Sequence, residues 1–81
     1  MSEKQIGVDC QFEVDGTIRI RRLFVDGRWS PVSQGRQWVD PLGRHVLIMF
    51  GDGPVVQITL RPDSMTWLLR PHDGGFQRRL V

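Results

Sequence analysis

The sequence predicts an all-β domain, a small antiparallel meander of five to six strands curled into an SH3-like barrel or roll. Two observations support this prediction. Turn signals recur about every 10–14 residues, and the residues between them mostly alternate between apolar and polar side chains. Size and strand count favour the SH3-like form over an OB-like one. The turn signals are Asp15-Gly16, Asp26-Gly27, Asp40-Pro41, Asp52-Gly53, Pro62-Asp63 and Asp73-Gly74.

The length and composition of the chain indicate one globular domain. With 81 residues, of which 40% are hydrophobic and 25% charged, we expect a single all-β domain over residues 1–81. Residues 1–6 are expected to form a disordered or frayed N-terminus. The longest apolar run, Val46–Phe50, is too short for a membrane span, and no apolar segment of a signal peptide follows the polar start. These features predict an intracellular, cytoplasmic protein.

The first predicted hairpin turns at Asp15-Gly16. A two-residue loop would place apolar residues opposite polar ones. A three-residue loop with Gly16 in the left-handed region instead pairs Phe12 with Ile18 and Cys10 with Ile20. The pairing of Cys10 with Ile20 predicts that Cys10 is an inert, buried thiol.

The second predicted hairpin turns at Asp26-Gly27, where a two-residue loop pairs Phe24 with Trp29. Strict alternation continues the core face of the preceding strand through Arg22 to Phe24, so Phe24 and Trp29 are expected in the core. Arg22 does not fit this face. Either its guanidinium reaches water from the rim of the core, or a bulge near Arg21-Arg22 shifts the alternation.

The second half of the chain contains further strand patterns. Arg44–Phe50 is apolar on both faces at its centre and predicts a covered central strand, and Val55–Leu60 predicts the next one. Met65–Arg70 fits either a short capped helix or a strand, and its β-branched and aromatic residues favour a strand. Phe76–Val81 is either an edge strand or a frayed end. Ser33–Gln37 is predicted as a loop because a glycine interrupts it.

No motif of the sequence predicts catalysis, a cofactor or a metal. The two histidines, His45 and His72, are 27 positions apart, and no nucleophile lies in a motif that would complete a triad. A single cysteine excludes a zinc site built from cysteines, and no glycine pattern resembles a phosphate-binding loop. His45 is expected to have a structural role. We therefore expect a binding protein and not an enzyme.

The candidate binding residues are arginines interleaved with a tryptophan. Guanidinium groups beside an indole are typical of single-strand nucleic-acid grooves, but the net charge is only +2. The predicted register also places Asp9 opposite Arg21 and Gln11 opposite Arg19, which partly neutralises the surface. We therefore favour a protein-interaction module or accessory subunit, which binds a protein partner or a second copy through an edge strand. A single-strand nucleic-acid-binding barrel is the alternative, and a small anion held by Arg36 or Arg44 is a third reading. The candidate residues are Arg19, Arg28, Arg36, Trp38 and Arg44.

Overall fold

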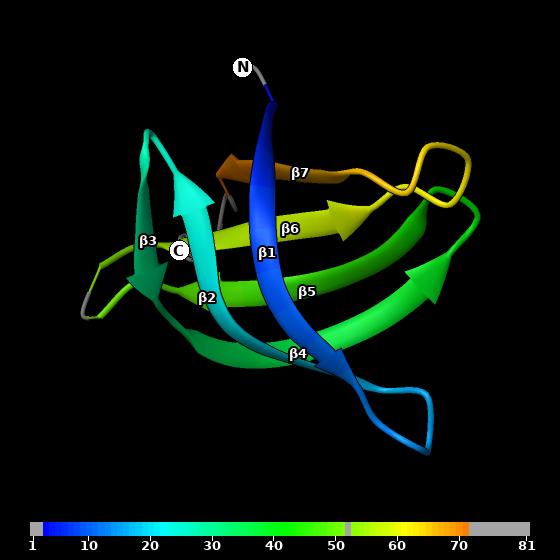
Figure 1. Ribbon diagram of the computed structural model, residues 1–81. Helices are drawn as coiled ribbons and strands as arrows, with labels where there is room; N and C mark the ends of the chain where they lie inside the picture. Colours follow the sequence, from blue (N-terminus) through cyan, green and yellow to red (C-terminus); the bar gives the residue numbers. More distant parts are fainter. Residues whose placement is uncertain (1–2, 52, 72–81) are drawn as a thin grey trace, which may run out of the picture.

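The computed structural model describes residues 3–51 and 53–71, and all the regular elements in these ranges are β-strands (Figure 1). The prediction of an all-β antiparallel domain curled into a small barrel or roll is confirmed, but with seven strands instead of five to six. No described segment is a helix that could cross a membrane. The strands are β1 (Lys4–Phe12), β2 (Ile18–Val25), β3 (Arg28–Pro31), β4 (Ser33–Asp40), β5 (Gly43–Met49), β6 (Val55–Leu60) and β7 (Trp67–Pro71).

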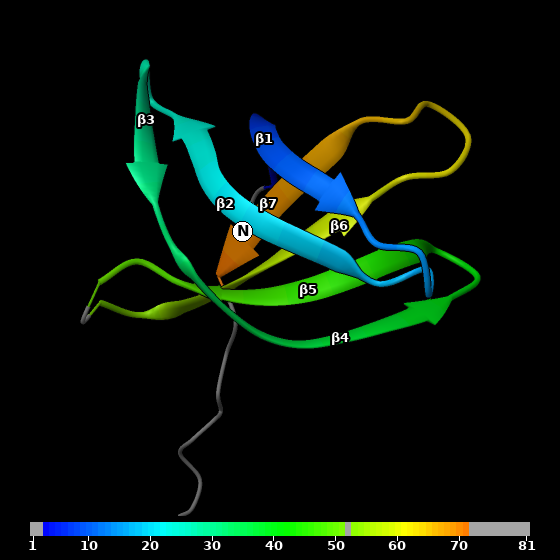
Figure 2. The same ribbon diagram turned by 60° about the horizontal axis from the view of Figure 1, so that its bottom comes forward.

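The sheet consists of two meanders joined by one pairing. The strand order is β3-β2-β1-β7-β6-β5-β4, and every described neighbour is antiparallel. We call β1–β3 the first meander and β4–β7 the second meander. Only Val32 separates β3 from β4, although these strands lie at opposite ends of the order. The sheet therefore has to curl, and Figure 2 shows β3 running directly on into β4.

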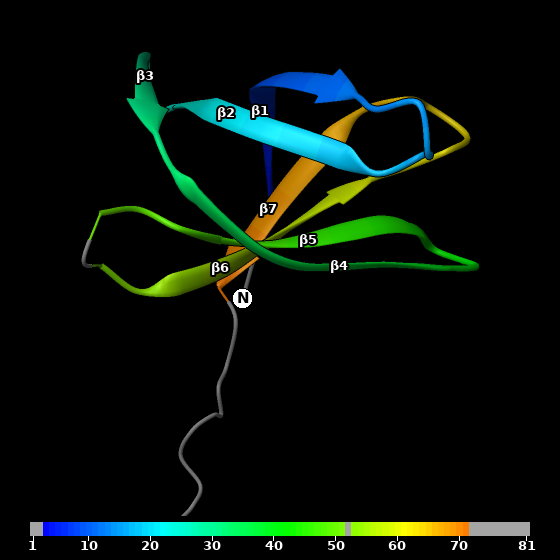
Figure 3. The ribbon, with the colours of Figure 1, turned by 90° about the horizontal axis from the view of Figure 1, so that it is seen from below.

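The core lies between the two meanders, which face each other in Figure 3. β2 supplies its residues from one side, and β5 and β6 supply theirs from the other. Burying each of these aliphatic side chains contributes about 1.5–3 kcal/mol. The buried hydrophobic residues among the described ones are Ile18, Ile20, Leu23, Val46, Ile48, Val56 and Ile58.

The first hairpin has the predicted geometry. Phe12 pairs with Ile18, Cys10 pairs with Ile20, and Gly16 has a φ of +92° in a three-residue loop. Cys10 is only partly buried, however, although it packs against the core. Burial is the main cause that raises the pKa of its thiol, with a smaller contribution from the charge of Asp9.

A β-bulge in β2 overturns the predicted position of two aromatic residues. The pairing shifts so that Asp9 lies opposite Arg22, which leaves Arg21 as the extra residue. Leu23 is therefore completely buried, whereas Phe24 is 39% exposed and its partner Trp29 is 45% exposed. The expectation that Phe24 and Trp29 lie in the core was wrong, and the bulge alternative is confirmed.

Residues 33–37 belong to strand β4, so the predicted loop was wrong. The register shifts between Gln34 and Gln37, because one extra residue is accommodated around Gly35. The interruption by glycine therefore indicates a bulge within a strand and not the absence of a strand.

Two glutamine side chains of β4, the last strand in the sheet order, bind the main chain of β2 across the curl of the sheet. The Gln34 side chain accepts a hydrogen bond from the N–H of Ile20 at 2.8 Å and donates to the carbonyl of Ile18 at 2.6 Å. Gln37 accepts from the N–H of Ile18 and donates to its carbonyl, both at 3.0 Å. At this seam, side-chain amides thus satisfy main-chain groups of β2 that have no strand beside them.

The two ends of the described chain pair with each other. Residues 4–6, predicted to be frayed, pair with residues 67–69 of β7. The predicted strand at Met65–Arg70 is confirmed from Trp67 onward. Met65, with a φ of 57°, lies in the preceding turn. Residues 1–2 and residues 76–81, for which an edge strand or a frayed end was expected, lie outside the described residues.

Candidate binding face

The outer face of the first meander carries an exposed aromatic pair. Phe24 and Trp29 lie opposite each other, with ring centroids 5.2 Å apart and ring planes tilted by 53°. Gly7 of β1 is the other cross-strand partner of Phe24. A Cβ atom at Gly7 would lie 3.1 Å from Cβ of Phe24 and 3.7 Å from Cη2 of Trp29. The two rings therefore pack over the bare backbone of Gly7 while much of their surface stays exposed to solvent.

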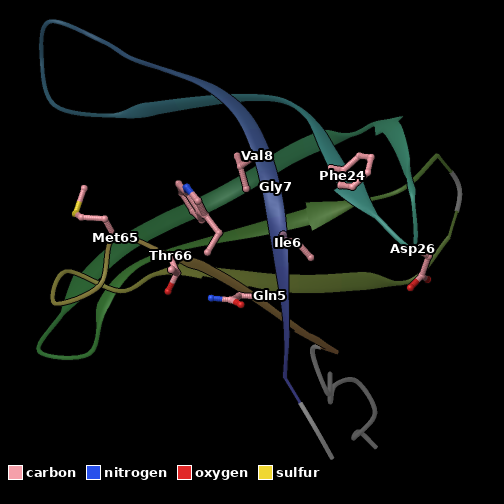
Figure 4. Close-up of a pocket in the computed structure, with 9 residues that line it drawn as sticks. Gln5, Ile6, Gly7, Val8, Phe24, Asp26, Met65 and Thr66 are labelled. Carbon is pink, nitrogen blue, oxygen red and sulfur yellow. The ribbon is translucent and has the colours of Figure 1, made fainter.

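A shallow groove of about 420 Å³ crosses β1 at Gly7. Figure 4 shows Met65 on one side of β1 and Phe24 with Asp26 on the other. Met65 is 66% exposed. The groove is lined by Gln5, Ile6, Gly7, Val8, Phe24, Asp26, Met65, Thr66 and Trp67. We call this groove together with Trp29 the aromatic face.

The charged groups beside the aromatic face are paired with one another. The guanidinium of Arg22 lies 4.8 Å from the ring centroid of Trp29, and its Nε donates to the carboxylate of Asp9 at 2.9 Å. Lys4 donates to the carboxylate of Asp26 at 3.0 Å. The aromatic face therefore has cations next to it, but neighbouring carboxylates neutralise these two.

The five predicted binding residues are spread over four strands. Arg19 on β2 forms an ion pair with Glu13 at 2.9 Å, and Arg28 lies next to Trp29 in the sequence of β3. Arg36 and Trp38 lie on β4, and Arg44 lies on β5 opposite Val39. Among the described residues, Arg36 and Trp38 are the only two of the five that contact as a cation–π pair, with 5.2 Å from the guanidinium carbon to the ring centroid.

Trp38 is half-buried because it covers a histidine. Its ring stacks on His45 with centroids 5.2 Å apart and an interplanar angle of 25°. His45 is only 4% exposed, and its Nε2 lies 2.7 Å from the carboxylate of Asp40. On the other side of the ring, Nδ1 lies 2.8 Å from the hydroxyl of Thr59 and 3.1 Å from the amide nitrogen of Gln57. Each ring nitrogen thus has a partner, as expected for a buried imidazole.

The hydrogen bond from His45 lowers the pKa of Asp40, and a backbone N–H from Leu42 adds to this effect. With Asp40 ionised, its carboxylate can only accept, so the protonated Nε2 of His45 donates the hydrogen bond. In the neutral ring, Nδ1 then accepts from Thr59 and Gln57. This network fully occupies the histidine, which agrees with the structural role expected for His45.

The sequence reasoning missed the exposure of Phe24, Trp29 and Met65. The signal that could have revealed the first two is the Arg21-Arg22 pair, where an apolar residue is missing from the alternation. Choosing the bulge at that point would have moved both rings to the outer face.

Comparisons of the chain with protein-family models, with curated proteins and with solved structures found no match. Among residues 3–51 and 53–71, no group of three or more His, Cys, Asp or Glu side chains could hold a metal ion.

Proposed function

We propose that the protein is an interaction module that binds a segment of another protein on its aromatic face. The observation that supports this proposal is the exposure of Phe24 and Trp29 side by side, together with Met65 across the groove. Aromatic residues and methionine are enriched at the centres of protein interfaces, and they dominate the binding energy there.

The charge arrangement favours a protein partner over a nucleic acid. A nucleic-acid face presents cations that are available to phosphates, but Arg22, Lys4 and Arg19 are held by carboxylates at 2.9–3.0 Å. A phosphate backbone would have to compete with these carboxylates. An apolar side chain entering the groove would leave the ion pairs intact.

The position of β3 supports a partner that is at least partly extended. β3 carries Trp29 and is a terminal strand in the sheet order, so its outer side has no strand partner among the described residues. A strand of the partner, or of a second copy, can add to this edge. Pro31 has no N–H, so the added strand would be short.

Capture from a lysate of the source cells, followed by reconstitution with the purified partner, tests the proposal. Wild type, the double variant Phe24→Ser/Trp29→Ser and the control Val39→Ser serve as baits, with and without nuclease. Val39 is an exposed apolar residue on β4, away from the aromatic face. We expect a nuclease-resistant protein that binds wild type and Val39→Ser, and that binds the double variant at least about tenfold more weakly. Equal binding to all three baits, or no nuclease-resistant partner, would contradict the proposal.

Single-strand nucleic-acid binding is the second candidate, and the Arg22–Trp29 contact is the observation that favours it. A base that stacked on Trp29 would lie beside a guanidinium. Titration with oligothymidylate at low salt tests this candidate. Stacking predicts that Trp29→Ala weakens binding by roughly 1–3 kcal/mol per stacked base, and that log K falls with log salt. If the amides of β2 and β3 do not shift in this titration, the candidate is excluded.

A further inference from the structure

A second cavity, separate from the aromatic face, lies on the outer face of the second meander. Its volume is about 190 Å³. Its centre is a cross-strand row in which Thr59 of β6 lies between His45 of β5 and Leu68 of β7. The residues that line it are Glu3, Leu42, His45, Thr59, Arg61, Leu68 and Arg70.

The two arginines of this cavity are held differently from those of the first meander. Arg61 Nη2 lies 3.5 Å from the carboxylate of Asp63, and Arg70 Nη1 lies 3.9 Å from that of Glu3. Both distances exceed the range of an N–H···O hydrogen bond, whereas Arg19 and Arg22 reach their carboxylates at 2.9 Å. Within the described chain, neither Arg61 nor Arg70 donates a side-chain hydrogen bond. As far as residues 3–51 and 53–71 are concerned, these N–H groups are open to a ligand.

Among the side chains that line the cavity, positive charge exceeds negative charge, although Asp63, which is outside the lining, lies 3.5 Å from Arg61. Glu3 is the one carboxylate of the lining, against the guanidinium groups of Arg61 and Arg70. Asp40 binds Nε2 of His45, whereas the opposite ring nitrogen, Nδ1, binds Thr59 in the cavity wall. The carboxylate of Asp40 is not part of the lining, so it does not add a second negative charge there.

The remaining walls of the cavity are apolar. Leu42 and Leu68 contribute them, and Leu42 is 67% exposed. The cavity has the volume of roughly six water molecules, which is more than a bare inorganic anion fills. A ligand that matches both parts carries an anionic head for the arginines and a short apolar tail for the leucines.

We propose that this cavity binds a small organic carboxylate, with the carboxylate between Arg61 and Arg70 and an apolar tail against Leu42 and Leu68. Guanidinium groups bind carboxylates through paired, charge-assisted hydrogen bonds, which are stronger than neutral ones. Glu3 competes with the ligand for Arg70. The carboxylate belongs either to a free small acid or to the end of a peptide chain, since both present the same head group.

NMR titration of the full chain with sodium butyrate, against sodium chloride at equal ionic strength, tests the site. We expect saturable shifts of the Thr59 and Leu68 amides with an affinity on the order of 1–10 mM, as suits so small a ligand. The double variant Arg61→Gln/Arg70→Gln raises the Kd at least about tenfold. The control Arg21→Gln/Arg28→Gln removes the same charge elsewhere and leaves the Kd unchanged. Glu3→Gln lowers the Kd because it removes the competing carboxylate.

Three outcomes would overturn the proposal. Shifts that follow ionic strength alone, or shifts that survive in the Arg61→Gln/Arg70→Gln variant, would exclude the site. Sodium phosphate binding as tightly as butyrate would exclude the apolar carboxylate as its ligand. A matching titration with acetyl-leucine, which ends as a peptide does, separates the two sources: tighter binding than butyrate indicates a chain end, and weaker binding indicates a free small acid.

Discussion

The two meanders use the same kinds of residue in opposite ways. On the outer face of the first meander, apolar rings are exposed and the nearby charges are paired in water, as with Phe24 and the Arg22–Asp9 pair. On the outer face of the second meander, polar groups are buried, and His45 and Gln57 are only 4% and 9% exposed. In the first meander, apolar side chains are exposed although apolar side chains are usually buried. In the second, a complete set of hydrogen bonds makes burial of polar groups possible.

The comparison also separates the two surfaces for which we propose binding. Where cations are already paired with carboxylates, as around Trp29, the surface offers a partner mainly its exposed apolar area. Where guanidinium groups lie beyond hydrogen-bond distance of a carboxylate, as with Arg61 and Arg70, the N–H groups of these arginines are left without a hydrogen-bond partner among the described residues. The two sites proposed on this small fold therefore differ in chemistry.

The largest expected effect distinguishes two neighbours in β2. Leu23 is fully buried and Phe24 is 39% exposed. Leu23→Ala should destabilise the fold by about 2–5 kcal/mol, because it leaves a cavity in the core. Phe24→Ala should lower stability by only about 1 kcal/mol, since its ring stays partly in water. Urea unfolding of both variants measures the difference. Equal losses would contradict the bulge at Arg21.

The next effect tests the seam between the meanders. The double variant Gln34→Ala/Gln37→Ala leaves main-chain groups of Ile18 and Ile20 without their partners. We expect a loss of about 2–4 kcal/mol and faster amide exchange at Ile18 and Ile20. Gln11→Ala serves as the control, because the Gln11 side chain bonds only exposed groups. Unchanged exchange at Ile18 in the double variant would show that other groups satisfy the seam.

A third pair of variants compares a buried polar group with an exposed one. His45→Phe keeps the ring and its stacking on Trp38 but removes the hydrogen bonds to Asp40 and Thr59. It should destabilise the protein by about 1–3 kcal/mol. Arg22→Ala, which breaks an exposed pair, should change stability by less than about 1 kcal/mol. Thermal unfolding compares them, and the reverse order would contradict the role of the buried network.

The smallest expected effect concerns acid, and it compares one aspartate from each meander. Hydrogen bonds lower the pKa of Asp15, mainly that from the backbone N–H of Thr17, and lower the pKa of Asp40, mainly that from His45. A carboxyl group with a lowered folded-state pKa stabilises the fold above its unfolded pKa of about 3.9, and this contribution is lost as the pH falls through the folded value. The midpoint temperature of thermal unfolding should therefore decrease as the pH is lowered below about pH 4.

Asp40→Asn and Asp15→Asn should each remove part of this acid dependence. The comparison is made on unfolding midpoints between about pH 6 and pH 2. Identical acid profiles in wild type and Asp40→Asn would contradict an ionised carboxylate that is held by His45.

Local turn chemistry explains why much of the first meander could be predicted. Gly16 adopts the expected positive φ, Gly27 also has a positive φ, and each turn sets the register of the strands beside it. The phase beyond Arg21 could not be settled in the same way. The sequence permits either a bulge or an arginine at the rim, and only the burial of Leu23 in the core cluster selects the bulge. The strict alternation that we predicted therefore placed both Phe24 and Trp29 on the wrong face of the sheet.

The candidate sites depend on contacts that a linear pattern does not contain. Trp38 and Trp29 both lie near arginines in the sequence, yet Trp38 is half-buried because it stacks on His45. The cavity at Arg61 and Arg70 depends on ion-pair distances, which differ from those of Arg19 although the residue types are the same. Strand β4 was missed for a similar reason, since its partner β5 explains why Gly35 can lie in a strand.

The pairing of residues 4–6 with residues 67–69 has a consequence for the folding kinetics. Within each meander every strand pairs with its neighbour in sequence, so the loops to be closed are short. The β1–β7 pairing closes almost the whole described chain and requires the largest loss of chain entropy. We therefore expect the two hairpin systems to form first and the β1–β7 pairing to complete folding. Substitutions at Ile6 should then mainly accelerate unfolding, while those in the Asp26-Gly27 turn should slow folding.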